Sequence, residues 1–216
     1  TAQLSFKPMH LEQALACPAA GLWFEVHAEN YMVEGGPRLA MLQALRKRFP
    51  LSIHGVGLSL AGSDEPDRQH LSKLKRLVDR FEPFLVSEHL AWSKHGDTSF
   101  PDLLPFPRTN EALEIIARNI DITQEFLGRQ MLIENPSLYL KLKGHEWPES
   151  LFLGELGAES QLCSTPRDKV PAPLLGQGLC WFMAQEFAVM FTGDVYPCCF
   201  PTDHVLGNLF YAEPMA

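Results

Sequence analysis

The first indication of how this chain folds is the stretch Leu22-Trp-Phe-Glu-Val-His-Ala-Glu-Asn30. Its residues alternate with the two-residue period of a β-strand, so that one face is apolar and the other carries three ionisable groups. The apolar face holds Leu22, Phe24, Val26 and Ala28, and the other holds Trp23, Glu25, His27 and Glu29. Charges that face a barrel interior are costly unless they are paired or bind a metal. A half-buried strand at a solvated sheet edge would show the same alternation.

The pattern of a short apolar strand with a polar end, followed by an amphipathic helix, recurs through the first 160 residues. Further strands are predicted at residues 51–56, 84–89 and 131–135. Helices are predicted from Pro37 to before Phe49-Pro50, over the apolar stripe of residues 71–81, and between Thr109 and Gly128. These units predict an α/β fold, a partial TIM-barrel-like parallel sheet of about four βα units.

The pattern changes near residue 160, where a Pro-rich and Cys-containing segment begins. We therefore expect two regions, a partial barrel over residues 1–160 and a small Cys-containing segment over residues 161–216. A hairpin turn is predicted at Thr192-Gly-Asp194, between two apolar runs.

Ionisable or amide side chains stand at the carboxyl ends of all four predicted strands, where α/β proteins place their chemistry. The last three strands contribute His54, Glu88, His89, Glu134 and Asn135. Imidazole and carboxylate ligands without thiolates suit iron, manganese or zinc. A xylose-isomerase-like barrel, which uses a divalent metal for isomerisation or hydrolysis, would need the same ligand types. A single His is also often a hydrogen-bonded core residue.

Composition argues against several classes of function. The chain carries 26 acidic and 18 basic residues, a formal net charge of -8, and lacks the basic patch of a nucleic-acid-binding protein. It has no apolar run long enough to span a membrane and no signal-peptide pattern at its start, which predicts a cytoplasmic protein. Four of its five cysteines follow residue 160, which indicates metal or redox chemistry there.

Four longer motifs carry a family resemblance. They are Glu25-Val-His-Ala-Glu-Asn-Tyr31, Leu51-Ser-Ile-His-Gly-Val-Gly-Leu-Ser59, Val86-Ser-Glu-His-Leu-Ala-Trp92 and Leu132-Ile-Glu-Asn-Pro-Ser137. In this order they resemble the multinuclear non-haem iron-dependent oxidative enzymes, which include the methanobactin biosynthetic oxidase. The resemblance implies a TIM barrel with two or three irons that uses dioxygen to modify a ribosomally made peptide. It also implies a partner protein that presents the peptide.

Site residues follow from these motifs by resemblance. The implied metal ligands are His54, Glu88, His89, Glu134 and Asn135, with Glu88 and Glu134 as the catalytic carboxylates. Five further residues are expected in the pocket or behind the ligands: Glu25, His27, Glu29, Asn30 and Asp102.

The chain departs from that family after residue 159, where the Asp-Val-Asn-Asn motif and the later ligands do not follow. A whole barrel takes roughly 250 residues, so we expect a partial barrel that needs a partner or a homodimer to cover its open edge. A non-catalytic binding or scaffold fragment is the alternative. The tail, with Cys180, Cys198 and Cys199, resembles part of the iron–sulfur (SPASM-type) extension of radical S-adenosylmethionine enzymes, which implies an iron–sulfur cluster.

Overall fold

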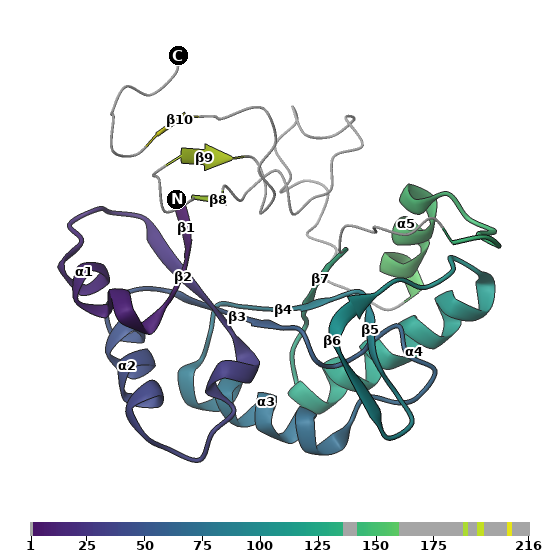
Figure 1. Ribbon diagram of the computed structural model, residues 1–216, viewed down its shortest axis with the longest axis horizontal. Coiled ribbons are helices and arrows are strands. Elements are labelled where there is room, and N and C mark those ends of the chain that lie inside the picture. The colour runs from purple at the N-terminus through teal and green to yellow at the C-terminus, as the bar shows by residue number, and fades with distance from the viewer. Residues whose placement is uncertain (1, 136–141, 160–187, 190–193, 197–206, 209–216) are drawn as a thin grey trace.

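A five-stranded parallel sheet forms the centre of the computed structural model, which describes residues 2–135, 142–159, 188–189, 194–196 and 207–208 (Figure 1). The strands lie in the order β1-β2-β3-β4-β7, and every neighbouring pair is parallel. Their bounds are β1 Ala2–Ser5, β2 Leu22–His27, β3 Leu51–Gly55, β4 Leu85–His89 and β7 Leu132–Glu134.

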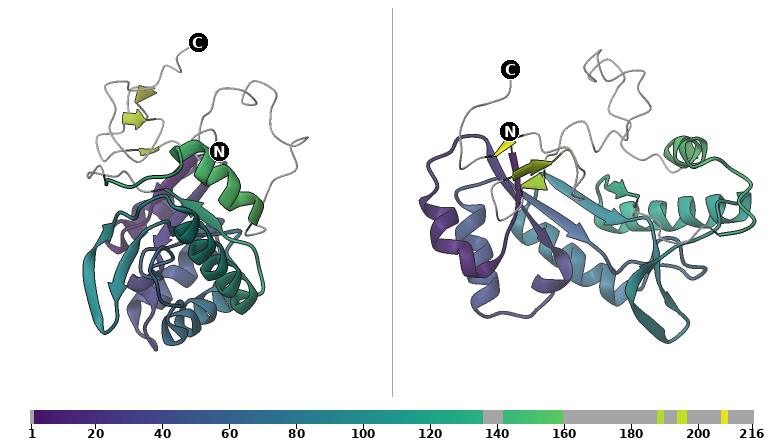
Figure 2. Two further views of the ribbon diagram at one scale, coloured as in Figure 1. Left: turned by 90° about the vertical axis from the view of Figure 1, so that its right-hand side faces the viewer. Right: turned by 45° about the horizontal axis from the view of Figure 1, so that its top comes forward.

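The strands follow one another across this sheet in the order in which they occur in the chain. The sheet therefore lacks the reversal of strand order that marks a doubly wound fold. Helices α1 to α4 lie on the same side of the sheet (Figures 1 and 2). Sequential parallel strands with helices on one side are the arrangement of a TIM barrel. The predicted α/β, partial TIM-barrel-like fold is therefore confirmed.

Two details of the predicted sheet are wrong. The sheet has five strands rather than four, because β1 precedes the first predicted strand and its four residues are too few to show a clear period. The strand predicted over residues 22–30 ends at His27, where the chain turns into the 3₁₀ helix η2, Ala28–Tyr31. Glu29 and Asn30 therefore leave the alternation of β2.

The three predicted helices are present as α2 Pro37–Arg46, α3 Arg68–Phe81 and α4 Asn110–Leu127, whose apolar stripes pack into one core with the sheet. The Thr109 hydroxyl accepts a hydrogen bond from the Ala112 N–H and caps α4. Gly128 ends the same helix with a φ of 71°, a left-handed conformation that glycine adopts without strain.

Several elements were not predicted. These are η1 Pro8–His10, α1 Leu11–Ala16, an antiparallel hairpin of β5 Trp92–His95 and β6 Thr98–Leu104, and α5 Glu149–Glu159. Strands β8 Ala188–Val189, β9 Asp194–Tyr196 and β10 Gly207–Asn208 form a small sheet in the tail. The predicted hairpin corresponds to the antiparallel β8 and β9, although residues 190–193 of its turn lie outside the described residues.

Within the described part of the chain, no helix has the length and apolarity to cross a membrane.

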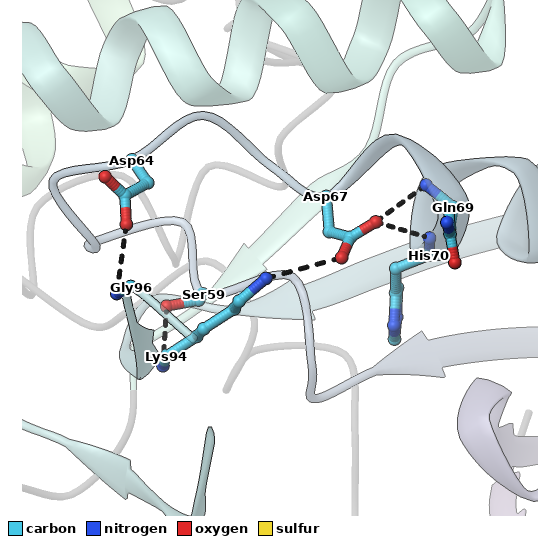
Figure 3. Close-up of polar contacts among 7 residues, drawn as sticks. All are labelled: Ser59, Asp64, Asp67, Gln69, His70, Lys94 and Gly96. Atoms are coloured by element: carbon cyan, nitrogen blue, oxygen red, sulfur yellow. Dashed lines mark hydrogen bonds and ion pairs between the residues drawn. The ribbon is translucent and has the colours of Figure 1, made fainter. Parts of the chain in front are cut away.

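The loop between β3 and α3 is tied to the β5–β6 hairpin by polar contacts (Figure 3). The Ser59 hydroxyl accepts hydrogen bonds from the backbone N–H groups of Ser93 and Lys94 at 2.9 and 3.2 Å. Asp67 caps α3 by accepting from Gln69 and His70, and its second oxygen lies 3.4 Å from the Lys94 ammonium. One loop thus connects the carboxyl end of β3 to the hairpin that follows β4.

Asn119 of α4 binds the backbone of the same loop. Its side chain is fully buried, and its amide donates to the carbonyl oxygens of Leu60, Gly62 and Asp64 at 3.0 to 3.2 Å. A buried carbonyl without a partner costs about 1–3 kcal/mol, so one amide satisfies much of the loop's buried backbone.

We expect Asn119→Leu to lower the free energy of unfolding by roughly 2 kcal/mol or more, because it leaves buried carbonyl groups without a donor. Urea denaturation would measure the loss. Glu114→Ala, at an exposed position of the same helix, should stay within about 0.5 kcal/mol of the native chain. Equal stability of Asn119→Leu and Glu114→Ala would show that the loop does not need this amide.

We expect Asp67→Ala to lower stability at pH 7 by about 1 kcal/mol through loss of the helix cap. Hydrogen bonds from the backbone of Gln69 and His70 lower the pKa of Asp67 from 3.8. A lowered folded-state pKa stabilises the fold above the unfolded-state pKa, and this contribution disappears as pH falls through the lower value. The difference between native and variant chains should therefore shrink in acid. A difference that is constant between pH 7 and the acid limit of folding would contradict the role of the carboxylate charge.

Candidate metal centre

The carboxyl ends of β2, β3, β4 and β7 are in lateral register. His27 lies beside His54, His54 beside Ser87, and His89 beside Glu134. Side chains at laterally paired positions of parallel strands point to the same side, and so do those two residues apart in one strand. His27, His54, His89 and Glu134 therefore share the face of the sheet opposite the helices.

Three of these side chains meet. His54 Nε2 lies 3.4 Å from Glu134 Oε2, and the His54 and His89 rings stand edge to face with centroids 4.5 Å apart. One ligand atom from each of His54, His89 and Glu134 lies within 4.8 Å of the other two. His54 and Glu134, both implied as ligands by the resemblance, therefore face the same site. The structure thus gathers two imidazoles and one carboxylate from three neighbouring strands.

The protonation of these imidazoles suits metal binding. Burial, together with the neighbouring His89 and His27, lowers the pKa of His54 to about 3. Burial also lowers the pKa of His89, although the Glu134 carboxylate opposes the shift. Both rings are therefore neutral at pH 7, and each has a nitrogen lone pair to offer a metal.

A hydrogen bond fixes one end of the His54 ring. Nδ1 lies 2.8 Å from the Ser87 hydroxyl, with a geometry that either tautomer satisfies. When Nδ1 carries the proton, the Nε2 lone pair faces the Glu134 carboxylate, and a cation between the two would relieve their repulsion. His89 Nδ1 is buried and has no hydrogen-bond partner among the described residues. These residues fit a metal ion by the chemistry of the donor set and by this unsatisfied nitrogen.

Glu25 lies on the same face, two residues before His27 in β2. Its carboxylate accepts a hydrogen bond from the Ser52 hydroxyl at 3.2 Å. Burial, with the nearby charge of Glu134, raises the pKa of Glu25 to about 7 against the opposing effect of Ser52. Glu25 is therefore a carboxyl group beside the cluster, on the same face of the sheet, that can hold or release a proton near neutral pH.

Glu88, predicted as a ligand and catalytic carboxylate, is not in this cluster. It pairs laterally with Gly55 and Ile133, one residue out of phase with the Ser87 and His89 positions, so it points to the helix side of the sheet. It is 1% exposed and accepts a hydrogen bond from the His89 N–H at 3.2 Å. Burial and the charge of Glu29 raise the pKa of Glu88 well above its usual range.

Gly55 makes room for this buried carboxyl group. A Cβ at position 55 would collide with Glu88 Oε2. The glycine in the Leu51–Gly55 strand therefore serves the close approach of a neighbouring side chain, not a turn.

The remaining predicted residues lie in different surroundings. The Asn135 amide donates to Glu149 Oε1 of α5 at 2.6 Å. His27 is exposed on the cluster's face with its ring 5.6 Å from that of His54, whereas Asn30 is exposed on η2. Asp102 is exposed in β6 and accepts a hydrogen bond from the N–H of the next residue, Leu103. Cys180, Cys198 and Cys199 lie outside the described residues.

Ser87 and His70 contact these groups and were not predicted. Ser87 has the parity of His89 in Val86-Ser-Glu-His89, and that pattern could have identified it. His70 lies in the first turn of α3, with Nε2 3.3 Å from Glu29 Oε1. It belongs to an amphipathic helix far along the chain, so no local pattern marks it.

A groove of about 680 Å³ opens at the other end of the sheet, by the amino ends of β2, β3 and β4. Among the described residues that line it, Arg48 is the one charged side chain, and its guanidinium donates to the Cys17 carbonyl. The described lining of the groove therefore offers none of the imidazole and carboxylate ligands found at the carboxyl ends.

Comparisons with known proteins identify the family to which the chain belongs. Residues 1–163 match the model of a family described as RiPP precursor modification enzyme MbnB/TglH/ChrH, where RiPP denotes a ribosomally made, modified peptide. All of the metal-centre residues lie within the match, and the three tail cysteines Cys180, Cys198 and Cys199 lie beyond it.

Curated relatives named UPF0276 proteins cover the same region. One from Caulobacter vibrioides is 59% identical over 160 residues, which are 74% of this chain and 57% of that protein. One from Rhizobium meliloti is 48% identical over 69% of this chain and 48% of its own length, and one from Bordetella pertussis is 44% identical over 74% and 55%. The chain thus spans about half the length of the curated relatives it matches. By the family model and these identities, the chain belongs to the MbnB/TglH/ChrH family of RiPP precursor modification enzymes.

Proposed function

We propose that this chain carries part of an iron centre that serves the dioxygen-dependent modification of a ribosomally made peptide. The observation that carries the proposal is the convergence of His54, His89 and Glu134 on one face of the sheet. The family supports a peptide substrate. Because the chain spans about half of its relatives, the full activity is proposed for an assembly that completes the barrel.

The choice of iron rests on the ligand set. Two histidines and one carboxylate on one side of a metal form the triad of non-haem iron oxygenases, which leaves the other coordination positions open. Bound iron would supply the redox chemistry with dioxygen. In the family, two or three irons are expected by resemblance, and further ligands would come from outside the five-stranded sheet described here.

The chain's own residues would hold and shape the site. Ser87 fixes the His54 ring, and the neutral imidazoles cost less to bury than charged ones. Glu25 would retain or release a proton behind the ligands. The Glu134 side chain remains 20% exposed, so the face of the cluster away from the helices is the side from which a peptide would approach.

The proposed assembly includes other chains. By family resemblance a partner protein would present the peptide, and a homodimer is the alternative that could cover the outer strand β7. A separate iron–sulfur cluster on Cys180, Cys198 and Cys199 is proposed on the resemblance of the tail alone.

A divalent-metal isomerase or hydrolase would use the same ligands without an oxidant, and a scaffold protein would need no metal. Dependence on dioxygen separates the first alternative from the proposed function, and metal content separates the second.

We expect the chain to retain iron when it is purified without oxygen and supplied with Fe(II). At limiting iron, His54→Ala or Glu134→Gln should reduce the iron occupancy of the site by about tenfold or more, because each change removes a ligand. Iron would be measured by elemental analysis alongside circular dichroism, which should change little.

The matched control is His95→Ala, an exposed imidazole on the β5–β6 hairpin. It should retain the iron of the native chain. Acid-labile sulfide in the same samples would reveal iron held by the tail cysteines instead. Equal iron in the native chain, His54→Ala and Glu134→Gln would show that the metal lies elsewhere.

For the activity, we expect an assembly that contains this chain to change the mass of a cysteine-containing precursor peptide in air but not under argon. Mass spectrometry of the peptide would detect the change. Turnover that proceeds equally under argon would favour the isomerase or hydrolase alternative.

A further inference from the structure

A second polar cluster, partly buried, lies on the helix side of the sheet, behind the metal centre. Glu29 of η2 accepts a hydrogen bond from the Val56 N–H at 3.0 Å, and the same oxygen lies 3.3 Å from His70 Nε2 of α3. Although burial alone would raise it, these contacts hold the pKa of Glu29 below its usual value. The pair joins an element after β2, the loop after β3 and the first turn of α3.

The backbone of the loop after β3 lies in close contact with this pair. A Cβ at Gly57 would lie 2.8 Å from His70 Cε1 and 3.0 Å from Glu29 Oε1, closer than side chains tolerate. The Glu29–His70 pair therefore packs directly against the backbone of Gly57. A movement of the pair would require the loop to move as well.

The same loop reaches Glu88. A Cβ at Gly55, just before the loop, would collide with Glu88 Oε2, and the Glu88 carboxyl group accepts a hydrogen bond from the N–H of the following residue, His89. The nearby backbone N–H of Leu58 lowers the pKa of Glu88 against the effect of burial. Glu29 thus binds the amide of Val56, the residue after the glycine against which Glu88 packs, and Glu88 lies near the amide of Leu58. A shift of residues 56–58 would move the Glu88 carboxyl group and the His89 backbone that it contacts.

Polar contacts of Asp67 hold the first turn of α3, which carries His70, in place. The Asp67 carboxylate accepts from the N–H groups of Gln69 and His70 and faces Lys94 of the hairpin (Figure 3). In Figure 3 the His70 side chain points away from Asp67. The imidazole is 21% exposed, so it lies partly within the protein, against Glu29.

We propose that His70 is a positioning residue which, through Glu29, fixes residues 56–58 and so holds Glu88 and the adjoining His89 in place behind the metal centre. Its effect on a metal rests on the proposed function above. Among the described residues Glu29 and His70 are not in the cluster that could hold an ion, so they act through other residues. Groups behind metal ligands commonly change metal affinity by 10- to 100-fold when they are removed.

The test compares His70→Ala, His70→Gln and Gln69→Ala in the full chain. Gln carries a side-chain nitrogen at nearly the reach of His Nε2, so His70→Gln should restore the contact to Glu29. Gln69→Ala is the matched control, because Gln69 is exposed in the same turn and contributes only its backbone N–H to the cap. If His70→Ala does not fold, His70→Asn, which is too short to reach Glu29, takes its place.

The first measurement needs no metal. Hydrogen exchange of the segment around residues 55–60 should be at least tenfold faster in His70→Ala than in Gln69→Ala, and His70→Gln should return toward the native rate. The second is titration with Co(II), whose visible spectrum reports the geometry of its ligands. Co(II) affinity should fall by about tenfold with an altered spectrum in His70→Ala, and His70→Gln should recover both.

The outcomes separate this inference from the proposed function. A native chain that binds no Co(II) would count against the metal centre, and hydrogen exchange alone would then decide whether the pair positions the loop. If the native chain binds Co(II), but His70→Ala matches Gln69→Ala in exchange, or in both Co(II) affinity and spectrum, the positioning role is overturned.

Discussion

The lateral register of β2, β3, β4 and β7 is the constraint on which the site depends. Main-chain hydrogen bonds between parallel strands align His54 with Ser87 and His89 with Glu134. A slip of one residue in any strand would send its side chain to the other face of the sheet. The apolar residues between the polar ones, such as Ile53 and Val86, resist that slip because they are buried against the helices.

This alternation creates two polar layers at the carboxyl ends of the strands. The layer away from the helices holds His54, His89 and Glu134, with ligand atoms close enough to share one ion. The layer toward the helices holds Glu88, which accepts a hydrogen bond from the His89 N–H, and, from η2, Glu29, which binds the Val56 N–H at the start of the loop after β3. We infer that the first layer supplies ligands and that the second keeps those ligands in place. The two layers meet at the adjoining residues Glu88 and His89.

Much of this could be predicted from the sequence, but not all. Alternation within each strand placed His54 and Glu134 on a common face, and the structure confirms that. The grouping of Glu88 with them was wrong in geometry, because adjacent residues of a strand cannot share a face. Glu29 was assigned to the face of Glu25 because nothing in the local pattern showed that β2 ends at His27. The hairpin β5–β6 escaped prediction because its strands are exposed and carry little apolar periodicity.

By itself the sequence determined the α/β class, the three main helices with caps such as Thr109, and the polar strand ends, because these depend on local periodicity and on side chains a few residues apart. Only the tertiary structure decided which polar groups meet. His70 reaches Glu29 across some forty positions of the chain, Asn119 holds carbonyls nearly sixty positions away, and both contacts arise when helices pack on the sheet. Such distances in sequence close only after the core has formed, since it is burial of the apolar stripes that sets where each helix lies.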